Sequence, residues 1–237
     1  MEKDVQILYA LGFILGDGVI MAIRVKWLGH SSFQIVTNSK VIYIDLKKYG
    51  KVVETTEKAD IILVTHNHGD HCSPPKIQKF RKKDTVIIAP RDCARRIVGV
   101  KTLKPGEEIT VDGVTIVAVE AYNLKRFKTS GKPWHPKGYG VGYLIKAEGK
   151  TIYHAGDTDF IPEMDGLKNI DLALLPTGNK YTMDNAEAAE AAIAIKPETA
   201  MAMHTWETDR VEFKNKVEAK SEIKVVLLQE GEEYQLG

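Results

Sequence analysis

Cysteine is scarce in this sequence of 237 residues, and neither sign of charge is in clear excess; each of these features excludes a class of protein. The two cysteines, Cys72 and Cys93, are too few for a disulfide framework, which favours a reducing compartment and a cytoplasmic location. Lysine and arginine number 33 against 32 acidic residues, so the formal charge is +1 and the chain has no overall basic field for gripping nucleic acid. The composition therefore argues against nucleic acid as a partner.

Long apolar runs are scarce as well. Residues 5–15 are mostly apolar, but Asp17 interrupts the run before it reaches the roughly 20 residues that a membrane-spanning helix needs. The same region has neither the basic start nor the small-residue cleavage site of a signal peptide. We therefore expect no membrane partner, and we interpret residues 1–20 as an N-terminal extension of a single domain, residues 21–237. The apolar part of the extension is a candidate surface for pairing with a second copy of the chain.

What the chain has instead is a series of short β-rich runs separated by turns. Antiparallel strands, hairpins at Asp112-Gly113 and Glu148-Gly149, and continuous apolar runs typical of buried strands are predicted at residues 22–28, 32–36, 40–46, 59–66, 84–90, 106–123, 140–157, 169–176, 198–206 and 223–228. An alanine-rich helix is predicted at residues 184–197, with Asp184 as its N-cap and Pro197 as its stop. Strands with helices outside, in two similar halves, predict two sheets packed face to face with helices covering both outer faces.

A dense cluster of coordinating side chains follows one of the buried strands. Histidine occurs only seven times in the chain, yet VTHNHGDHCSP places His66, His68, Asp70 and His71 within six positions. Imidazole nitrogens suit zinc, iron and manganese, and a carboxylate tolerates a second metal ion. His66 and His68 alternate in extended chain and can face one ion, whereas Asp70 and His71 follow the bend at Gly69 and can face a neighbouring ion. The alternative, a polar loop with incidental histidines, does not explain this density.

The segment HNHGDH resembles the HxHxDH motif of the metallo-β-lactamase-fold hydrolases, and the resemblance extends over nearly all of residues 22–230. WLGHSSF, YHAGDTD and LLPTGNKYTM are similar to the branch that includes ascorbate-6-phosphate lactonases and N-acyl-phosphatidylethanolamine phospholipases. The resemblance implies an α/β fold, an αββα sandwich of two mixed β-sheets flanked by helices, with a two-metal site at the sheet edge. It also implies hydrolysis of esters, lactones, amides or phosphodiesters.

The resemblance implies the remaining metal ligands too. Asp157 in HAGDTD matches the carboxylate that bridges the two metals, and His204 in AMHTW matches the last ligand of the second metal. Asn123 stands where the family usually has the third histidine of the first metal, and an amide oxygen is a poorer ligand than imidazole. His135, twelve residues further on, is the candidate that completes the site. Asn123 itself is the alternative, and if neither serves, the first site is degenerate.

Further candidates surround this cluster. His30 in GHSSF either points into the pocket or is a hydrogen-bonded turn histidine, and Asp45 either orients a ligand imidazole or caps a turn. The loop at residues 125–137 carries five lysines and arginines and no acid. It is either a solvated loop or an electrostatic funnel for a phosphorylated or carboxylated substrate. Trp134 and Tyr181 are candidate pocket walls.

Together these residues predict a metal-dependent hydrolase in which two divalent ions, zinc first and manganese or iron as alternatives, activate a water. Asp70 is expected to ligate a metal ion and to orient that water, and His30 is the second catalytic candidate. The predicted partner is a small, anionic molecule with an ester, lactone or phosphodiester bond. Two alternatives remain. One is a nuclease acting on RNA or DNA, although such enzymes usually carry an added nucleic-acid-binding domain and this chain has little room for one. The other is a non-enzymatic module that keeps a metal for stability.

Overall fold

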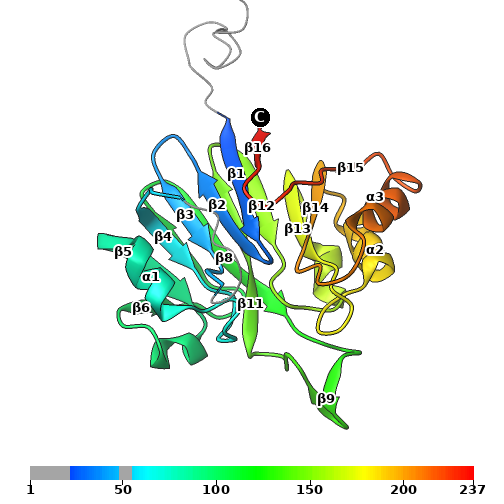
Figure 1. Ribbon diagram of the computed structural model, residues 1–237, viewed down its shortest axis with the longest axis horizontal. Coiled ribbons are helices and arrows are strands. Elements are labelled where there is room, and N and C mark those ends of the chain that lie inside the picture. The colour runs from blue at the N-terminus through cyan, green and yellow to red at the C-terminus, as the bar shows by residue number, and fades with distance from the viewer. Residues whose placement is uncertain (1–21, 48–54) are drawn as a thin grey trace, which may run out of the picture.

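Two seven-stranded β-sheets pack face to face, and helices cover the outer face of each sheet (Figure 1). The structure is a computed structural model that describes residues 22–47 and 55–237. The predicted extension at residues 1–20, with its candidate pairing surface, lies outside the described residues. The predicted αββα sandwich of the α/β class is confirmed.

The first sheet has the strand order β16-β1-β2-β3-β4-β5-β6. Its strands are β1 (Ile23–Gly29), β2 (Ser32–Val36), β3 (Val41–Ile44), β4 (Ala59–Leu63), β5 (Arg81–Ala89), β6 (Val100–Thr102) and β16 (Glu233–Leu236). Strands β16, β1, β2 and β3 pair antiparallel, whereas β3 to β6 pair parallel. The sheet is therefore mixed, as predicted.

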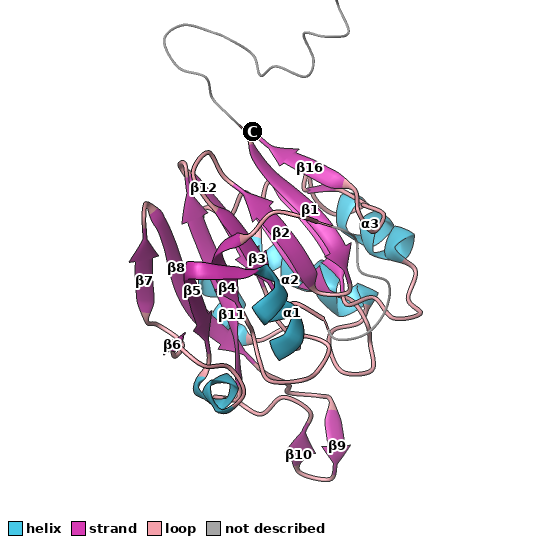
Figure 2. Ribbon diagram, turned by 60° about the vertical axis from the view of Figure 1, so that its left-hand side comes forward, coloured by secondary structure: helices cyan, strands magenta, loops and turns pink. Residues whose placement is uncertain are grey.

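The second sheet has the order β15-β14-β13-β12-β11-β8-β7 and is mixed in the same way. Its strands are β7 (Glu108–Val111), β8 (Val114–Ala121), β11 (Gly140–Ala147), β12 (Lys150–His154), β13 (Leu172–Pro176), β14 (Thr199–Met203) and β15 (Lys224–Val225). The pairs from β7 to β12 are antiparallel and those from β12 to β15 are parallel. Strands β9 (Phe127–Thr129) and β10 (Lys132–Pro133) form a separate arm that projects from the body (Figure 2).

Helix α1 (Pro74–Phe80) lies beside the first sheet, and α2 (Asn185–Ile195) and α3 (Arg210–Glu218) lie beside the second (Figure 1). Short 3₁₀ turns occupy Arg91–Arg95 and Pro162–Gly166. The predicted N-cap of α2 is confirmed, because the carboxylate of Asp184 accepts a 2.8 Å hydrogen bond from the backbone N–H of Glu187. This bond satisfies one of the N–H groups that a helix leaves unpaired at its start.

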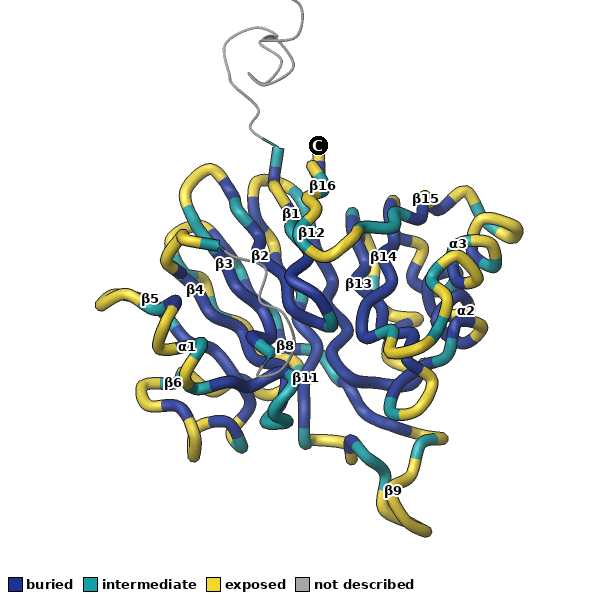
Figure 3. Tube along the Cα trace, in the orientation of Figure 1, coloured by how far each residue is buried: buried dark blue, intermediate teal, exposed yellow. Residues whose placement is uncertain are grey.

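The apolar strands are buried on both faces, which explains their continuous hydrophobic runs (Figure 3). In β4, Ile61 and Leu63 pack between the two sheets, while Ile62 points outward to the layer under α1. Ile77 and Phe80 of α1 complete that outer layer. Each fully buried side chain of this size contributes roughly 1.5–3 kcal/mol relative to exposure, so both layers hold the sheets in a fixed geometry.

The loops that carry the candidate ligands leave neighbouring strand ends. The carboxyl ends of β3, β4, β12 and β14 lead into Asp45, His66, Asp157 and His204. Because the carboxyl ends of parallel strands meet at one edge of a sheet, and the two sheets face each other, these four loops come together.

The C-terminal region differs from the prediction of a strand at residues 223–228. Only Lys224 and Val225 pair with β14. Val226, Leu227 and Leu228 leave the sheet and pack, half-buried, against the core, and the chain returns as β16 to the first sheet. An apolar run predicts burial, which these residues have, but burial does not require strand pairing.

Candidate metal centre

The turn after β4 separates the clustered ligands into two directions. The backbone N–H groups of His71 and Cys72 both donate to the carbonyl of His68, at 3.1 and 2.8 Å. This tight turn brings His66 and His68 into one group of donor atoms and Asp70 and His71 into another, while His66 and His71 also share a group with Asp157.

The first group of donor atoms comprises nitrogens of His66, His68 and His135. His68 Nδ1 lies 3.0 Å from His66 Nε2 and 3.2 Å from His135 Nε2. Asp157 Oδ2 lies 3.4 Å from His135 Nε2 and 3.9 Å from His66 Nε2. Four ligands at about 2.0–2.1 Å in a tetrahedron around zinc would be separated by roughly 3.3 Å. The spacing of these four atoms therefore suits one small cation.

Asn123 supports His135 instead of replacing it. Its amide oxygen accepts hydrogen bonds from the backbone N–H of His135 at 2.8 Å and from Nδ1 of the same residue at 2.9 Å. Its amide nitrogen donates to Asp159 Oδ1 at 3.0 Å and to the carbonyl of Tyr181 at 2.9 Å. The Asn123 side chain is thus fully engaged, and it fixes the His135 ring with Nε2 facing His68.

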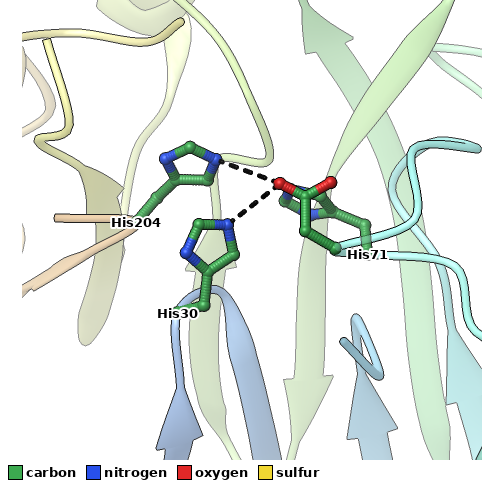
Figure 4. A group of neighbouring side chains, drawn as sticks. His30, His71 and His204 are labelled. Atoms are coloured by element: carbon green, nitrogen blue, oxygen red, sulfur yellow. Dashed lines mark hydrogen bonds and ion pairs between the residues drawn. The ribbon is translucent and has the colours of Figure 1, made fainter. Parts of the chain in front are cut away.

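The second group contains Asp70, His71 and His204, with His30 beside them. Asp70 Oδ2 lies 3.2 Å from His30 Nε2, 3.8 Å from His71 Nε2 and 4.0 Å from His204 Nε2. His30, His71 and His204 point toward one another from three separate loops (Figure 4). His30 combines parts of both alternatives, because it is a turn residue with a φ of 56° and a hydrogen bond to Asp70, and its ring faces the second group of donor atoms.

Asp157 connects the two groups. Its Oδ1 lies 3.3 Å from His71 Nε2, while its Oδ2 lies 3.1 Å from His204 Nε2 and 3.4 Å from His135 Nε2. One carboxylate therefore contacts histidines of both groups, in the place where a bridging ligand was expected.

Asp45 occupies the orienting role that was one of its two alternatives. Its Oδ2 lies 2.7 Å from Nδ1 of His71, which leaves Nε2 of that ring facing Asp157. The same carboxylate accepts hydrogen bonds from the backbone N–H and the hydroxyl of Thr65. Thr65 Oγ1 in turn lies 3.0 Å from Nδ1 of His66. One buried acid thereby orients rings in both groups, a role for Thr65 that the sequence did not indicate.

The electrostatics favour neutral rings in the first donor group but not at His71, where burial alone would lower the pKa and the neighbouring Asp157 and Asp45 raise it well above its usual range, so a cation at His71 Nε2 must displace a proton. Burial lowers the pKa of His66 and His68, and it lowers the pKa of His135 to about 4, so these rings are neutral at pH 7. Burial by itself would raise the pKa of Asp157, but the neighbouring His204 and His71 hold it well below its usual range. A deprotonated imidazole nitrogen and an ionised carboxylate are both electron-pair donors, so the group is ready to bind a cation.

Buried atoms without hydrogen bonds test whether a cation fits. Among the residues that the structure describes, nine buried side-chain atoms have no hydrogen-bond partner, and three of them, His71 Nε2, His204 Nε2 and Asp157 Oδ1, lie among the clustered donor atoms. Unpaired buried polar atoms are rare because each costs about 1–3 kcal/mol. All three belong to the two donor groups, and a bound cation would satisfy them together. The donor set therefore fits a metal centre.

His154 is the one histidine of the seven that lies outside these groups. Its Nε2 lies 3.0 Å from the carbonyl of Ser31, and its Nδ1 accepts a hydrogen bond from the backbone N–H of Gly156. The side chain is completely buried, in agreement with the opposite-face position that the strand alternation gives it.

A pocket of about 380 Å³ opens above the donor atoms. It is lined by His68, Gly69, Asp70, Trp134, His135, Asp157, Tyr181, His204 and Trp206. Trp134 and Tyr181 are therefore pocket walls. Trp206 was not identified from the sequence, although an aromatic residue two positions after a ligand histidine was the available signal.

Much of the basic loop at residues 125–137 is neutralised within the protein. Arg126 forms ion pairs of 2.7 Å with Asp159 and 2.6 Å with Glu187, and its side chain is 11% exposed. Lys125 pairs with Glu187, and Lys137 pairs with Glu163. Arg126 ties the start of the loop to the body, whereas Lys125 and Lys137 stay 67% and 55% exposed and residues 127–132 are all exposed, so most of the loop is the solvated segment of the first alternative.

The fold and the paired donor groups define a protein of the metallo-β-lactamase class. Residues 24–204 match the family of beta-lactamase superfamily domains. Metal-dependent hydrolases of the UPF0173 family are 40% identical over 232 residues in Thermococcus kodakarensis and 33% identical over 228 residues in Pelotomaculum thermopropionicum. Each alignment covers 90% of this chain and 100% of the relative. The chain belongs to the UPF0173 metal-dependent hydrolase family of the metallo-β-lactamase superfamily.

Solved structures agree with this assignment. A metal-dependent hydrolase from Parabacteroides distasonis has a TM-score of 0.82 and 34% identity, over 89% of this chain and 94% of its own. Igni18, a metallo hydrolase from Ignicoccus hospitalis, has a TM-score of 0.74 and 26% identity, over 90% of this chain and 98% of its own. Within the described residues, none of the helices is long and apolar enough to cross a membrane.

Proposed function

We propose that this hydrolase uses two divalent metal ions to cleave an ester, lactone or phosphodiester bond in a small, anionic substrate, as in the lactonase and phospholipase branch that its motifs resemble. The observation that carries the proposal is the clustering of six of the chain's seven histidines with Asp70 and Asp157 in neighbouring groups of donor atoms, beside a pocket that three of these histidines line. A purely structural metal site needs one ion and four closed ligands. Two donor groups beside an open pocket suit catalysis better.

The ligands divide naturally between two ions. His66, His68 and His135 would hold the first, Asp70, His71 and His204 the second, and Asp157 would contact both. Zinc suits a set dominated by imidazole, with manganese and iron as alternatives. When bound, the ions supply Lewis acidity at the substrate oxygen and lower the pKa of a water.

The chain's own residues orient the reactants. The Asp70 side chain is 34% exposed and borders the pocket, where its carboxylate can accept a hydrogen bond from the attacking water and fix its direction. The Nε2–H of His30, 3.2 Å from Asp70 Oδ2, holds that carboxylate in place. The walls formed by Trp134 and Tyr181 exclude bulk water from the scissile bond.

Charge supports an anionic substrate. Two divalent ions carry four positive charges, against one negative charge on each of Asp70 and Asp157, so the loaded pocket keeps a positive field near the donor atoms. Both cysteines are free and buried, which suits a reducing compartment, and we place the protein in the cytoplasm on that ground.

Metal content and turnover together test the proposal. Protein purified without chelator should hold close to two ions per chain by elemental analysis and should hydrolyse at least one member of a panel of aryl esters, lactones and phosphodiesters. The variant His68→Ala should lose about one ion and most of the turnover, whereas His154→Gln, at a histidine outside the donor groups, should keep both ions at pH 8. Normal turnover by metal-depleted His68→Ala protein would overturn the scheme. Two ions without turnover of any ester, lactone, phosphodiester or nucleic acid would favour the metal-stabilised binding module.

A further inference from the structure

Three aromatic rings form one wall of the metal pocket. Trp134, Tyr181 and Trp206 all line it, next to the donor atoms of His135 and His204. The rings of Trp134 and Tyr181 meet edge to face with centroids 4.7 Å apart, and Tyr181 and Trp206 follow at 5.9 Å. The three residues come from the loop after β10, the loop after β13 and the loop after β14. A continuous aromatic wall is thus assembled from three separate segments.

Trp206 is both exposed and held in an unusual backbone conformation. It is 57% exposed, and its φ of 45° lies in the left-handed region, which bulky side chains rarely adopt. His204, two residues earlier, also has a positive φ of 49°. Unfavourable backbone conformations persist where the surrounding structure enforces them, and they concentrate at functional sites. The turn therefore holds the Trp206 ring beside His204, a candidate metal ligand, and both residues adopt an unfavourable backbone conformation there.

The backbone at Gly178 packs directly against the turn that carries His204 and Trp206. A Cβ atom added at Gly178 would lie 2.3 Å from the carbonyl oxygen of His204 and 2.7 Å from Cδ1 of Trp206. Only a residue without a side chain lets the indole pack against this backbone. The position of Trp206 is therefore a built feature of the pocket and not a loose surface side chain.

Two lysines lie over rings of the wall. Lys128 Nζ lies 5.6 Å from the Trp134 ring centroid, and Lys180 Nζ lies 5.2 Å from that of Tyr181. Cation–π contacts of this kind stabilise the rings where they stand.

We propose that Trp134, Tyr181 and Trp206 bind a flat aromatic group of the substrate next to the scissile bond. The proposal rests on the proposed hydrolytic function and narrows its substrates to aryl esters, aryl lactones and aryl phosphodiesters. Aromatic pairs prefer edge-to-face or offset contacts at centroid distances of about 4.5–7 Å, which a three-ring wall offers to an incoming ring. A cavity of about 150 Å³ is known to hold benzene, so a pocket of 380 Å³ has room for a phenyl ring and the hydrolysed group.

Binding of non-hydrolysable phosphonates separates this subsite from the reaction. Methylphosphonate, cyclohexylphosphonate and phenylphosphonate share the anionic head that the metal ions attract, and they differ in the group presented to the wall. Calorimetry on the metal-loaded protein should show phenylphosphonate binding about tenfold or more tighter than methylphosphonate, and about 3- to 10-fold tighter than cyclohexylphosphonate. The variant Trp206→Ala should reduce the phenyl-to-methyl ratio below about threefold with metal content unchanged, whereas Trp206→Phe should keep most of it.

Val211→Ala is the matched control, because Val211 is also an exposed apolar residue, at 47%, but lies on α3 away from the pocket. It should leave all three affinities as in the wild type. Equal binding of phenyl- and cyclohexylphosphonate, or a wild-type ratio in Trp206→Ala, would overturn the aromatic subsite even if the protein hydrolyses esters. A phenyl preference that depends on Trp206 in a protein without turnover would support the subsite and count against the proposed reaction alone. Absence of binding by all three phosphonates would also overturn the subsite.

Discussion

Replacing Asn123 by alanine tests how this chain completes its first donor group. The substitution removes the acceptor for two N–H groups of His135, and it removes the donor to Asp159 and to the carbonyl of Tyr181. Asn123 is 5% exposed and His135 is 2% exposed, so water reaches the vacated groups poorly. The His135 ring then loses the contact that fixes its tautomer and orientation.

The size of the effect follows from these contacts. A buried polar group left without its partner costs about 1–3 kcal/mol, and Asp159 keeps its bonds to the backbone N–H groups of Leu124 and Lys125. Partial hydration of the small cavity offsets part of the loss, so we expect destabilisation of about 2–4 kcal/mol in the metal-free protein. Loss of the group that orients a ligand imidazole typically weakens metal binding about 10- to 100-fold. The weakening should affect one of the two ions.

Competition with a chromophoric chelator measures both ion affinities, and urea unfolding of the metal-free protein measures stability. Asn185→Ala is the matched control, since Asn185 is 4% exposed and donates two 2.9 Å hydrogen bonds, to the Asp209 carbonyl and to Glu212, far from the donor groups. It should lose stability and keep both affinities. Wild-type affinity for both ions in Asn123→Ala, or an equal loss in Asn185→Ala, would refute the argument that Asn123 acts through His135.

Two further predictions concern positions around the centre. Burial lowers the pKa of His154, so below about pH 6.5 the unfolded chain binds a proton that the folded chain does not, and the stability should fall with decreasing pH by up to about 1.4 kcal/mol per pH unit. Urea unfolding of His154→Gln and wild type between pH 8 and pH 5 should show the variant losing less stability on acidification; parallel curves would contradict the assignment. Gly178→Ala should cost about 1–3 kcal/mol and release one ion more readily than the other, because the new Cβ collides with the His204 carbonyl. Unchanged binding of both ions in the alanine variant would mean that the turn can move without cost to the ligand.

Predictions from the sequence were most accurate for features whose residues lie close together in the chain. His66, His68, Asp70 and His71 lie within six positions, and their spacing was enough to predict that they come together, although β4 ends at Leu63 and the segment from Thr65 to His68 contains bends instead of the expected extended strand. The N-cap at Asp184 was equally predictable, because a cap bond joins residues three positions apart. Local spacing determines both features.

Contacts between distant segments could not be predicted in the same way. His135 and Asn123 were both candidates for the third ligand, and the hydrogen bonds between them, together with the anchor at Asp159, decided between orienting and donating roles. The charge of Arg126 was visible in the sequence, but its burial against Asp159 and Glu187 was not. The composition gives only the number of charged residues, whereas the electrostatic field in a pocket depends on which of these residues already form ion pairs.

The sequence by itself determined the αββα architecture and the presence of a cluster of metal-binding side chains, because hydrophobic periodicity and ligand spacing are local properties of the chain. The tertiary structure decided how that cluster is completed and what surrounds it. Asp157, His135 and His204 reach it from loops far apart in the sequence, and Trp206 joins Trp134 and Tyr181 only where those loops meet. Such contacts arise from the packing of two sheets, which brings strand ends together whatever their separation along the chain.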